Sequence, residues 1–323
     1  MTTATDAKAA ITMEDMSKFY GDQAALNGLS LTVPEGSVFG LLGENGAGKT
    51  TTLQILLGLI RADSGSARVL DLDPARDGLE IRRRVGYVPE QPALYDWMTV
   101  SEIGWFAAGF HPEPGLGTAP FQTRYADLTT GFNLPQNRKV KALSKGMRAK
   151  VSLSLALASA PSLLILDEPT SGLDTMVRRE FLESMVDLAA GGRTVLLSSH
   201  QIAEVERVAS HVAFLRRGNL LLAEPLDELK ARTFLLAINF QSRDHATAPP
   251  ASLPLELIDA ADAPRQAHWL VHARDRAACD AVRNLPGVES VSIESPRLED
   301  IYVGYMRGRR PAPGPQASAA HVA

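Results

Sequence analysis

The segment that most constrains this chain is a phosphate-binding loop, or P-loop, at residues 43–51. Its sequence, Gly-Glu-Asn-Gly-Ala-Gly-Lys-Thr-Thr, fits the pattern G-x-x-x-x-G-K-[ST]. The apolar stretch Ser37–Leu42 precedes it and is typical of a buried strand, and apolar residues recur at helical spacing between positions 53 and 60. A strand, such a loop and a helix in succession form the context in which the pattern binds phosphate, so we predict a nucleotide site here.

Each residue type in the loop has a physical role in holding a phosphate. Glycine lacks a Cβ, so the backbone can fold tightly around the anion and its N–H groups can converge on the phosphate oxygens. Lys49 is expected to reach the β- and γ-phosphates, and the Thr50 hydroxyl is expected to bind Mg²⁺. The predicted contacts are Gly43, Asn45, Gly46, Gly48, Lys49, Thr50 and Thr51.

Composition narrows the class of protein. A chain of 323 residues favours two domains, and 45 % apolar with 22 % charged residues is typical of a soluble globular chain. The net charge of −4 provides no general attraction to nucleic acid or to an anionic membrane surface, so we expect no nucleic-acid partner. A single cysteine, Cys279, excludes an internal disulfide and a multi-cysteine metal site.

No segment of the sequence predicts a membrane span or a secretory signal. The longest apolar run, Val151–Leu166, is interrupted by serines and by Pro161. Residues Met1–Ala9 include Asp6 and lack an apolar core. We therefore expect a protein that could meet a membrane only through a partner.

Strands alternate with helices around the P-loop, which predicts a doubly wound α/β core. The expected segments are an N-terminal tail (1–10), the core domain (11–224) with a helical subdomain (about 92–160), a C-terminal domain (225–307) and a Pro/Ala-rich tail (308–323). In the C-terminal domain we expect strands at 234–240, 268–273 and 288–293 and helices at 275–284 and 298–306. That mixture predicts a small α+β domain.

Two carboxylates follow the apolar run Leu163–Leu166. Asp167, at the end of this expected central strand, is expected to hold Mg²⁺ through water, because Mg²⁺ keeps most of its hydration shell. Glu168 comes next and could polarise the water that attacks a γ-phosphate. The alternative for the pair is a helix N-cap after a strand, which a neighbouring P-loop makes the minor interpretation.

Two further stretches have both a plain and a functional interpretation. Leu143-Ser144-Lys145-Gly146-Met147 begins an expected helix, and its serine could be an ordinary N-cap or part of a second anion site. Tyr20 is an aromatic near the start of the domain, and the pattern alone leaves it at even odds whether it is only a half-buried strand residue.

Taken in order, these motifs make residues 11–224 resemble the ATP-binding subunit of ABC transporters. The order is an aromatic A-loop (Tyr20), Walker A (Gly43–Thr51), a Q-loop region (Tyr87–Gln91), the signature (Leu143–Met147), Walker B (Leu163–Asp167) with Glu168, a D-loop (Ser171–Asp174) and a switch histidine (His200). The resemblance implies the fold of an ABC-type P-loop ATPase: a mixed α/β sheet with helices, antiparallel strands and a helical subdomain, here followed by the α+β domain.

The resemblance also implies roles. Tyr20 would stack on the adenine of ATP, Glu168 would activate water, and His200 would touch the γ-phosphate and that carboxylate. Ser144 and Gly146 would face the γ-phosphate bound by the second subunit of a head-to-tail homodimer, and Asp174 would help to connect the two sites. ATP and Mg²⁺, held by Thr50 and Asp167, are the implied ligands.

The sequence departs from the family pattern at the Q-loop and in the signature. Glu90 occupies the position directly after Pro89 where the family has glutamine, and Gln91 follows it, so either could face the nucleotide. A carboxylate there would lie near others, and neighbouring carboxylates raise each other's pKa. Lys145 stands where the family most often has glycine, and it could add positive charge near the partner's phosphate or point to solvent.

The ending Leu298-Glu299-Asp300-Ile301-Tyr302 resembles that of ATPases that pair with ABC-2-type permeases. This implies an exporter subunit on the inner face of the cell membrane, bound there through a separate permease. Tyr95 and Trp97 are candidates for the permease contact, and packing within the helical subdomain is the equal alternative. The competing classes are a soluble ABC ATPase that acts on ribosomes or DNA and an importer ATPase with a regulatory C-terminal domain.

Overall fold

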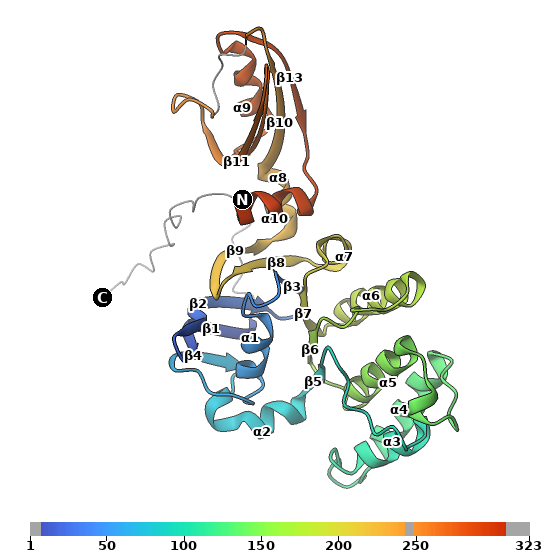
Figure 1. The fold of residues 1–323 in the computed structure, drawn as a ribbon. Coiled ribbons are helices and arrows are strands. Elements are labelled where there is room, and N and C mark those ends of the chain that lie inside the picture. Colours follow the sequence, from blue (N-terminus) through green and yellow to red (C-terminus); the bar gives the residue numbers. More distant parts are fainter. Residues whose placement is uncertain (1–7, 243–247, 308–323) are drawn as a thin grey trace. The chain divides into compact units, whose positions relative to one another are not determined.

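The computed structural model describes residues 8–242 and 248–307 (Figure 1). They form two compact units that divide between Ala223 and Glu224. The first unit contains a mixed sheet, an antiparallel sheet and a group of helices, and the second is a smaller α+β unit, which confirms the predicted fold class. The predicted tails fall mostly on residues 1–7 and 308–323, outside the described residues, and the first strand already begins at Ala9.

A six-stranded sheet with the order β5-β6-β7-β3-β8-β9 forms the centre of the first unit. Its strands are β3 (Val38–Gly43), β5 (Val85–Val88), β6 (Leu163–Asp167), β7 (Thr194–Ser199), β8 (His211–Arg216) and β9 (Asn219–Pro225). Strands β3, β6 and β7 are buried along their whole length, as expected for parallel strands covered on both faces. Because β3 and β6 both pair with β7 in parallel, their carboxyl ends meet at one edge, where the functional motifs follow them.

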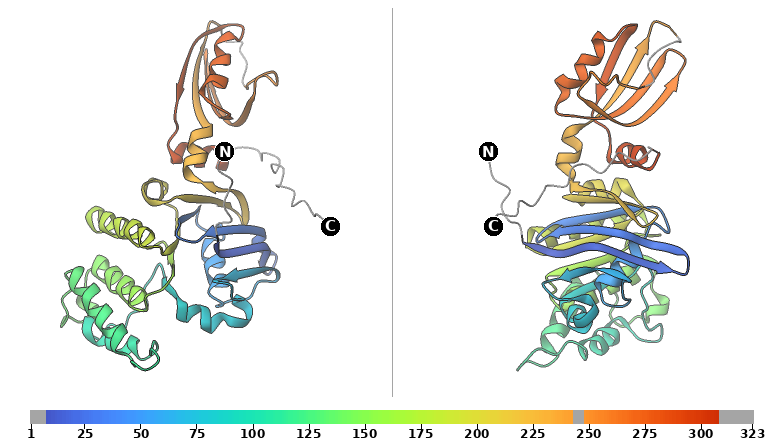
Figure 2. Two further views of the ribbon diagram at one scale, coloured as in Figure 1. Left: turned by 180° about the vertical axis from the view of Figure 1, so that it is seen from behind. Right: turned by 90° about the vertical axis from the view of Figure 1, so that its left-hand side faces the viewer.

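A three-stranded antiparallel sheet, ordered β2-β1-β4, lies beside helix α1 (Figures 1 and 2). Its strands are β1 (Ala9–Tyr20), β2 (Gln23–Pro34) and β4 (Ser64–Val69), and the helices of this region are α1 (Lys49–Leu56) and α2 (Pro74–Arg84). Leu53 and Leu56 of α1 are fully buried in a core that also contains Met13 and Leu31 from the sheet. This packing fixes α1, and with it the end of the P-loop.

The helical subdomain (green in Figure 1) has its own apolar core. It contains α3 (Val100–Ala108), α4 (Ala119–Gly131), the short helix η1 (Val140–Ala142) and α5 (Lys145–Ala158). Thr99 and Glu102 form a capping box at the start of α3, and the buried Tyr125 hydroxyl donates to Val100 O at 2.8 Å. Helices α6 (Thr175–Ala190) and α7 (Ile202–Val208) follow β6 and β7.

The second unit is a four-stranded antiparallel sheet, ordered β11-β12-β10-β13. Its elements are α8 (Leu226–Arg232), β10 (Thr233–Phe240), β11 (Leu255–Ala263), β12 (Gln266–Ala273), α9 (Arg276–Asp280), η2 (Ala281–Asn284), β13 (Val288–Glu294) and α10 (Leu298–Arg307). Trp269 is fully buried in its core. His272 on β12 lies 2.8 Å from the Tyr305 hydroxyl on α10, and burial lowers the pKa of this imidazole to about 4, so the contact is made by the neutral ring.

Two elements of this unit were not predicted from the sequence. Strand β11 is an edge strand with mostly exposed residues, so it lacks the apolar alternation that marks a half-buried strand. Helix α8 has seven residues, too few for a clear helical period. Within residues 8–242 and 248–307, no helix is both long enough and apolar enough to span a membrane.

Candidate nucleotide-binding site

The P-loop borders a cavity of about 530 Å³ at the carboxyl edge of the parallel sheet. Several predicted site residues line it together: Tyr20, Asn45, Gly46, Gly48, Lys49, Thr50, Thr51, Glu90, Glu168 and His200. Five residues that were not predicted as contacts also line it: Gln23, Ala25, Glu44, Ala47 and Ser171. Glu44 and Ala47 lie within the predicted Walker A motif and Ser171 within the predicted D-loop, whereas nothing in the sequence around Gln23 and Ala25 marks them as ligand contacts. The structure thus gathers residues separated by up to 180 positions around one space.

The shape of the P-loop depends on two glycines with left-handed backbone conformations. Gly48 has φ 109°, and a Cβ there would lie 2.6 Å from Ala25 O, so no other residue fits without a shift. Gly46 has φ 79°, and a Cβ there would meet no atom within 4 Å. The Gly218 N–H donates to Ala47 O at 2.9 Å and ties the loop to the turn between β8 and β9.

Lys49 is the first residue of α1, and its ammonium group is held inside the site. Nζ donates to Gly43 O at 2.7 Å and lies 3.1 Å from Glu168 Oε1. Both side chains are buried, with 6 % of Lys49 and 8 % of Glu168 exposed. Burying either charge alone would be costly, and their attraction offsets part of that cost.

Glu168 is fixed between β6 and the start of α7. Its Oε2 lies 2.7 Å from His200 Nδ1 and accepts from the His200 N–H at 3.2 Å. Its backbone φ is 45°, a left-handed conformation that is uncommon outside glycine and that turns the chain after β6. Oε1 is buried and, apart from the ion pair with Lys49, forms no hydrogen bond with the described residues. This carboxylate can accept a proton from a water in the cavity.

Asp167 precedes Glu168 in the chain and is buried, with 3 % of the residue exposed, but unlike Glu168 it does not line the cavity. Its Oδ1 accepts from the Ser198 hydroxyl at 2.6 Å, and among the described residues it has no basic partner. Burial of Tyr87, and to a smaller extent the negative charge of Asp167, raise the pKa of this tyrosine to about 12. Ser198 was missed from the sequence, although its place at the polar end of the buried strand β7 could have indicated it.

Asp167 and Thr50 are suited to bind a cation that is also bound by the phosphates of a nucleotide. Among residues 8–242 and 248–307, no group of three His, Cys, Asp or Glu side chains could bind a metal by itself. Mg²⁺ keeps several waters and usually takes only one or two carboxylates together with substrate phosphates. Asp167, a buried carboxylate without a cation partner among the described residues, and the Thr50 hydroxyl, on a residue that lines the cavity, match this requirement.

The two Q-loop candidates, Glu90 and Gln91, differ in their position relative to the cavity. Glu90 lines the cavity, whereas Gln91 does not contribute to its wall. Tyr20 also lines the cavity and is 53 % exposed, and Lys18 Nζ lies over its ring, 5.6 Å from the ring centre. An exposed aromatic at the edge of a phosphate cavity is suited to stacking on a base.

The signature residues Ser144 and Gly146 and the D-loop residue Asp174 do not reach this cavity. Ser144 caps α5 by accepting from the Met147 N–H at 3.2 Å, and Asp174 caps α6 by accepting from Met176 and Val177 N–H groups at 3.1 Å. Gly146 is packed against α6, since a Cβ there would lie 3.1 Å from a methyl group of Val177. Ser144, Gly146 and Asp174 are absent from the wall of the cavity, so this copy of the chain does not complete the predicted site by itself.

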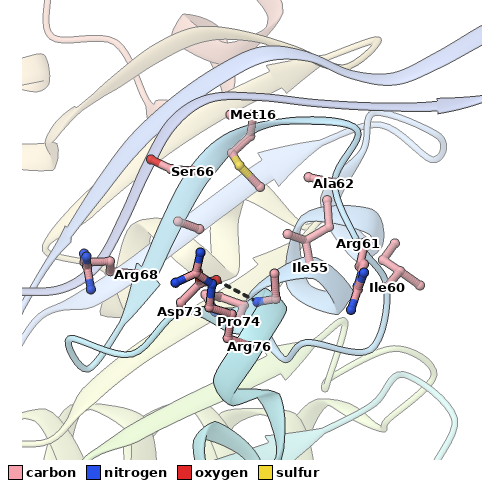
Figure 3. Close-up of a pocket in the computed structure, with 13 residues that line it drawn as sticks. Met16, Ile55, Ile60, Arg61, Ala62, Ser66, Arg68, Asp73, Pro74 and Arg76 are labelled. Carbon is pink, nitrogen blue, oxygen red and sulfur yellow. Dashed lines mark hydrogen bonds and ion pairs between the residues drawn. The ribbon is translucent and has the colours of Figure 1, made fainter.

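A different hollow, of about 470 Å³, lies between β4 and the start of α2 (Figure 3). Arg61, Arg68 and Arg76 lie around it, and the buried Met16 and Ile55 contribute apolar surface. It contains none of the predicted site residues, so the chemistry discussed above belongs to the P-loop cavity.

Proteins of known structure resemble this chain in fold and in sequence. The structure of an ATP-binding subunit of an ABC transporter matches with a TM-score of 0.62 and 32 % identity, over 68 % of this chain and 92 % of that one. A dimeric ATP-binding cassette, MJ0796, bound to ADP and phosphate matches in fold with a TM-score of 0.61 and 23 % identity, over 67 % of this chain and 98 % of that one.

The sequence comparison decides the family. The model of the ABC transporter family matches residues 26–171. The daunorubicin resistance ATP-binding protein DrrA2 of Streptomyces coeruleorubidus is 34 % identical over 306 residues, which are 91 % of this chain and 94 % of that protein. The chain belongs to the ABC transporter ATP-binding family. This ABC subunit therefore binds ATP and is an ATPase, as the resemblance of its motifs implied.

Other ABC relatives are named for transport. The bacitracin transport ATP-binding protein BcrA of Bacillus licheniformis is 35 % identical over 222 residues, 68 % of this chain and 70 % of that protein. The Nod factor export ATP-binding protein I of Ralstonia nicotianae is 37 % identical over 211 residues, 64 % of each chain.

Proposed function

We propose that this ABC ATPase powers export through a separate ABC-2-type permease, and that two copies of it share their ATP molecules. The observation that carries the ATPase chemistry is the chain of contacts beside the P-loop cavity, which runs from the buried Lys49 through the buried Glu168 to His200. The names of the relatives, which include drug resistance, bacitracin transport and Nod factor export, support the exporter class.

Within this proposal the residues of the cavity divide the work. Tyr20 stacks on the adenine, the P-loop from Gly43 to Thr51 holds the phosphates, and Thr50 and Asp167 hold Mg²⁺. Bound there, Mg²⁺ would neutralise charge on the phosphate oxygens. Glu168 accepts the proton of the attacking water, and His200 keeps this carboxylate oriented.

The position of the signature supports a shared site. Ser144 and Gly146 begin helix α5, whose N–H groups form an anion-binding end, yet neither residue lines the cavity of its own chain. A head-to-tail second copy supplies the missing phosphate. ATP then lies between two subunits and holds them together, and its hydrolysis removes the charge that closes the interface.

An exposed group of aromatic residues on the helical subdomain supports the permease contact. Tyr95 packs edge-on against Phe106, which packs against Phe110, both with ring centres 5.3 Å apart, and Trp97 lies 6.1 Å from Tyr95. Trp97 is 64 % exposed and Trp105 is 72 % exposed. We call Tyr95, Trp97, Trp105, Phe106 and Phe110 the aromatic patch. Clustered exposed aromatics mark interaction surfaces, and a permease is the partner that this function requires.

The segment Leu298–Tyr302, whose sequence resembles the ending of ATPases that pair with ABC-2-type permeases, packs within the second unit. Leu298, Ile301, Tyr302 and Tyr305 of α10 are buried, and the helix packs on β11. The motif therefore stabilises the α+β unit, and attachment to the membrane is assigned to the aromatic patch.

If the aromatic patch contacts the permease, changing the patch should reduce permease-stimulated ATP hydrolysis and leave basal ATP hydrolysis unchanged. The protein is co-expressed with an ABC-2-type permease, sought first among the genes that adjoin its own, and reconstituted in liposomes. ATP hydrolysis is then compared with and without the permease. Replacing Trp97 and Trp105 together with alanine is expected to reduce permease-stimulated hydrolysis by about tenfold or more, since aromatic anchors often contribute 2 kcal/mol or more each. Basal hydrolysis should remain unchanged, because neither tryptophan lines the nucleotide cavity.

Leu79→Ala is the matched control, since Leu79 is 61 % exposed but lies on α2, outside the aromatic patch. If the double variant is stimulated as strongly as the parent, the patch is not the permease contact. If no adjoining permease binds or stimulates the parent protein, the classes of ABC ATPase without a transport role gain support.

A further inference from the structure

Lys145, the first residue of α5, lies against the D-loop of its own chain. Helices α5 and α6 are neighbours, and the D-loop turn leads directly into α6 (Figure 1). Gly172 in this turn has φ 68°, and a Cβ there would overlap Lys145 Nζ and lie 3.2 Å from its Cε. The lysine side chain therefore extends over the turn, with its ammonium group close to Gly172.

The charge of Lys145 has no partner within the described part of the chain. Two other cations of α5 are paired: Arg148 with Asp96 at 2.6 Å and Lys150 with Glu180 at 2.7 Å. Lys145, in contrast, forms neither an ion pair nor a hydrogen bond with the described residues, and it is exposed. An ammonium group that is positioned but unpaired is suited to bind an anion from another molecule.

The neighbours of this lysine indicate which anion that is. Ser144 precedes it, and under the proposed function that serine faces the nucleotide of a second copy. Gly172 follows Ser171, which lines the nucleotide cavity of the same copy and donates from its N–H to Glu168 O at 3.0 Å. Lys145 thus lies where the signature meets the D-loop, on the surface that the shared-site dimer places against the second nucleotide.

We propose that Lys145 binds the phosphates of the ATP held by a second copy of this chain, and that its contact with Gly172 orients it before the copies meet. This inference rests on the proposed shared-site dimer. A free lysine loses side-chain entropy when it binds, and the contact with the glycine turn reduces that loss. The lysine supplies a charge that the glycine usual at this signature position cannot supply.

The test measures dimerisation in a Glu168→Gln background, in which hydrolysis is blocked. Sedimentation with Mg²⁺-ATP, at several KCl concentrations, gives the dimer dissociation constant. Adding Lys145→Ala should raise this constant about tenfold, the effect of one charge-assisted contact, and should make it less dependent on salt. Lys145→Arg should retain most of the affinity. Binding of ATP to the monomer should not change, since Lys145 is outside the cavity of its own chain.

Lys141→Ala serves as the control, because Lys141 is an exposed lysine on η1, shortly before α5. The role of Lys145 is overturned if Lys145→Ala dimerises as tightly as its parent at every salt concentration, or if Lys145→Arg fails as badly as Lys145→Ala. A parent that forms no ATP-dependent dimer at all would instead overturn the shared site on which the inference rests.

Discussion

Replacing Lys49 with alanine is expected to abolish ATP hydrolysis, with a loss of at least about a hundredfold. The ammonium group lies on the P-loop backbone, 2.7 Å from Gly43 O, where it can move to the β- and γ-phosphates. The substitution removes that charge and also leaves the carboxylate of Glu168 buried without its cation, which destabilises the site. Phosphate release and binding of a fluorescent ATP analogue measure the two effects.

A control must distinguish a loss of catalysis in the Lys49→Ala variant from a loss of its folded structure. Thermal unfolding of the variant shows whether the first unit is intact, and a Lys49→Ala, Glu168→Gln double variant removes the unpaired charge as well. The double variant should regain stability but not hydrolysis. If Lys49→Ala still turns over ATP at the normal rate, the assignment of the P-loop as the phosphate site is wrong.

Replacing Glu168 with glutamine is expected to separate binding from hydrolysis. An amide of the same size cannot accept the proton of the attacking water, so turnover should fall by about 100-fold to 10,000-fold. The contacts of ATP with the P-loop should remain, and the protein should accumulate as an ATP-bound dimer. Turnover, together with the molar mass with and without ATP, measures this outcome.

The same cavity offers a matched control for Glu168→Gln. Glu90→Gln makes the same chemical change at another carboxylate of the wall, and it should keep most of the activity because it restores the residue usual in the family. Normal hydrolysis by Glu168→Gln would move the catalytic role to Glu90 or to His200. A large loss with Glu90→Gln would show that this departure in the Q-loop is part of the chemistry.

The fold class and the family could be predicted because their signals are local. The P-loop lies between a buried strand and an apolar helix face, and Asp167 ends a strand of continuous apolar residues. Short patterns of this kind are determined by neighbours in the chain, so they can be recognised without knowing the tertiary contacts.

Other features depend on contacts between distant residues and could not be predicted. The bond from Ser198 to Asp167 joins two adjacent strands, and the left-handed backbone at Glu168 results from the turn it must make toward His200. Sequence alone also left Glu90 and Gln91 as equal candidates, since the direction of a loop residue is set by tertiary packing. In the structure Glu90 borders the cavity.

The central claim is that each ATP lies between the P-loop of one copy and Ser144 of another. Mixing two variants tests it most directly: Lys49→Ala with Glu168→Gln in one chain, and Ser144→Arg with Glu168→Gln in the other. Neither should dimerise alone with ATP, but the mixture should form a heterodimer that retains one ATP, since one intact P-loop then faces one intact signature. If the mixture forms no ATP-dependent dimer while the Glu168→Gln parent does, the shared-site account is contradicted.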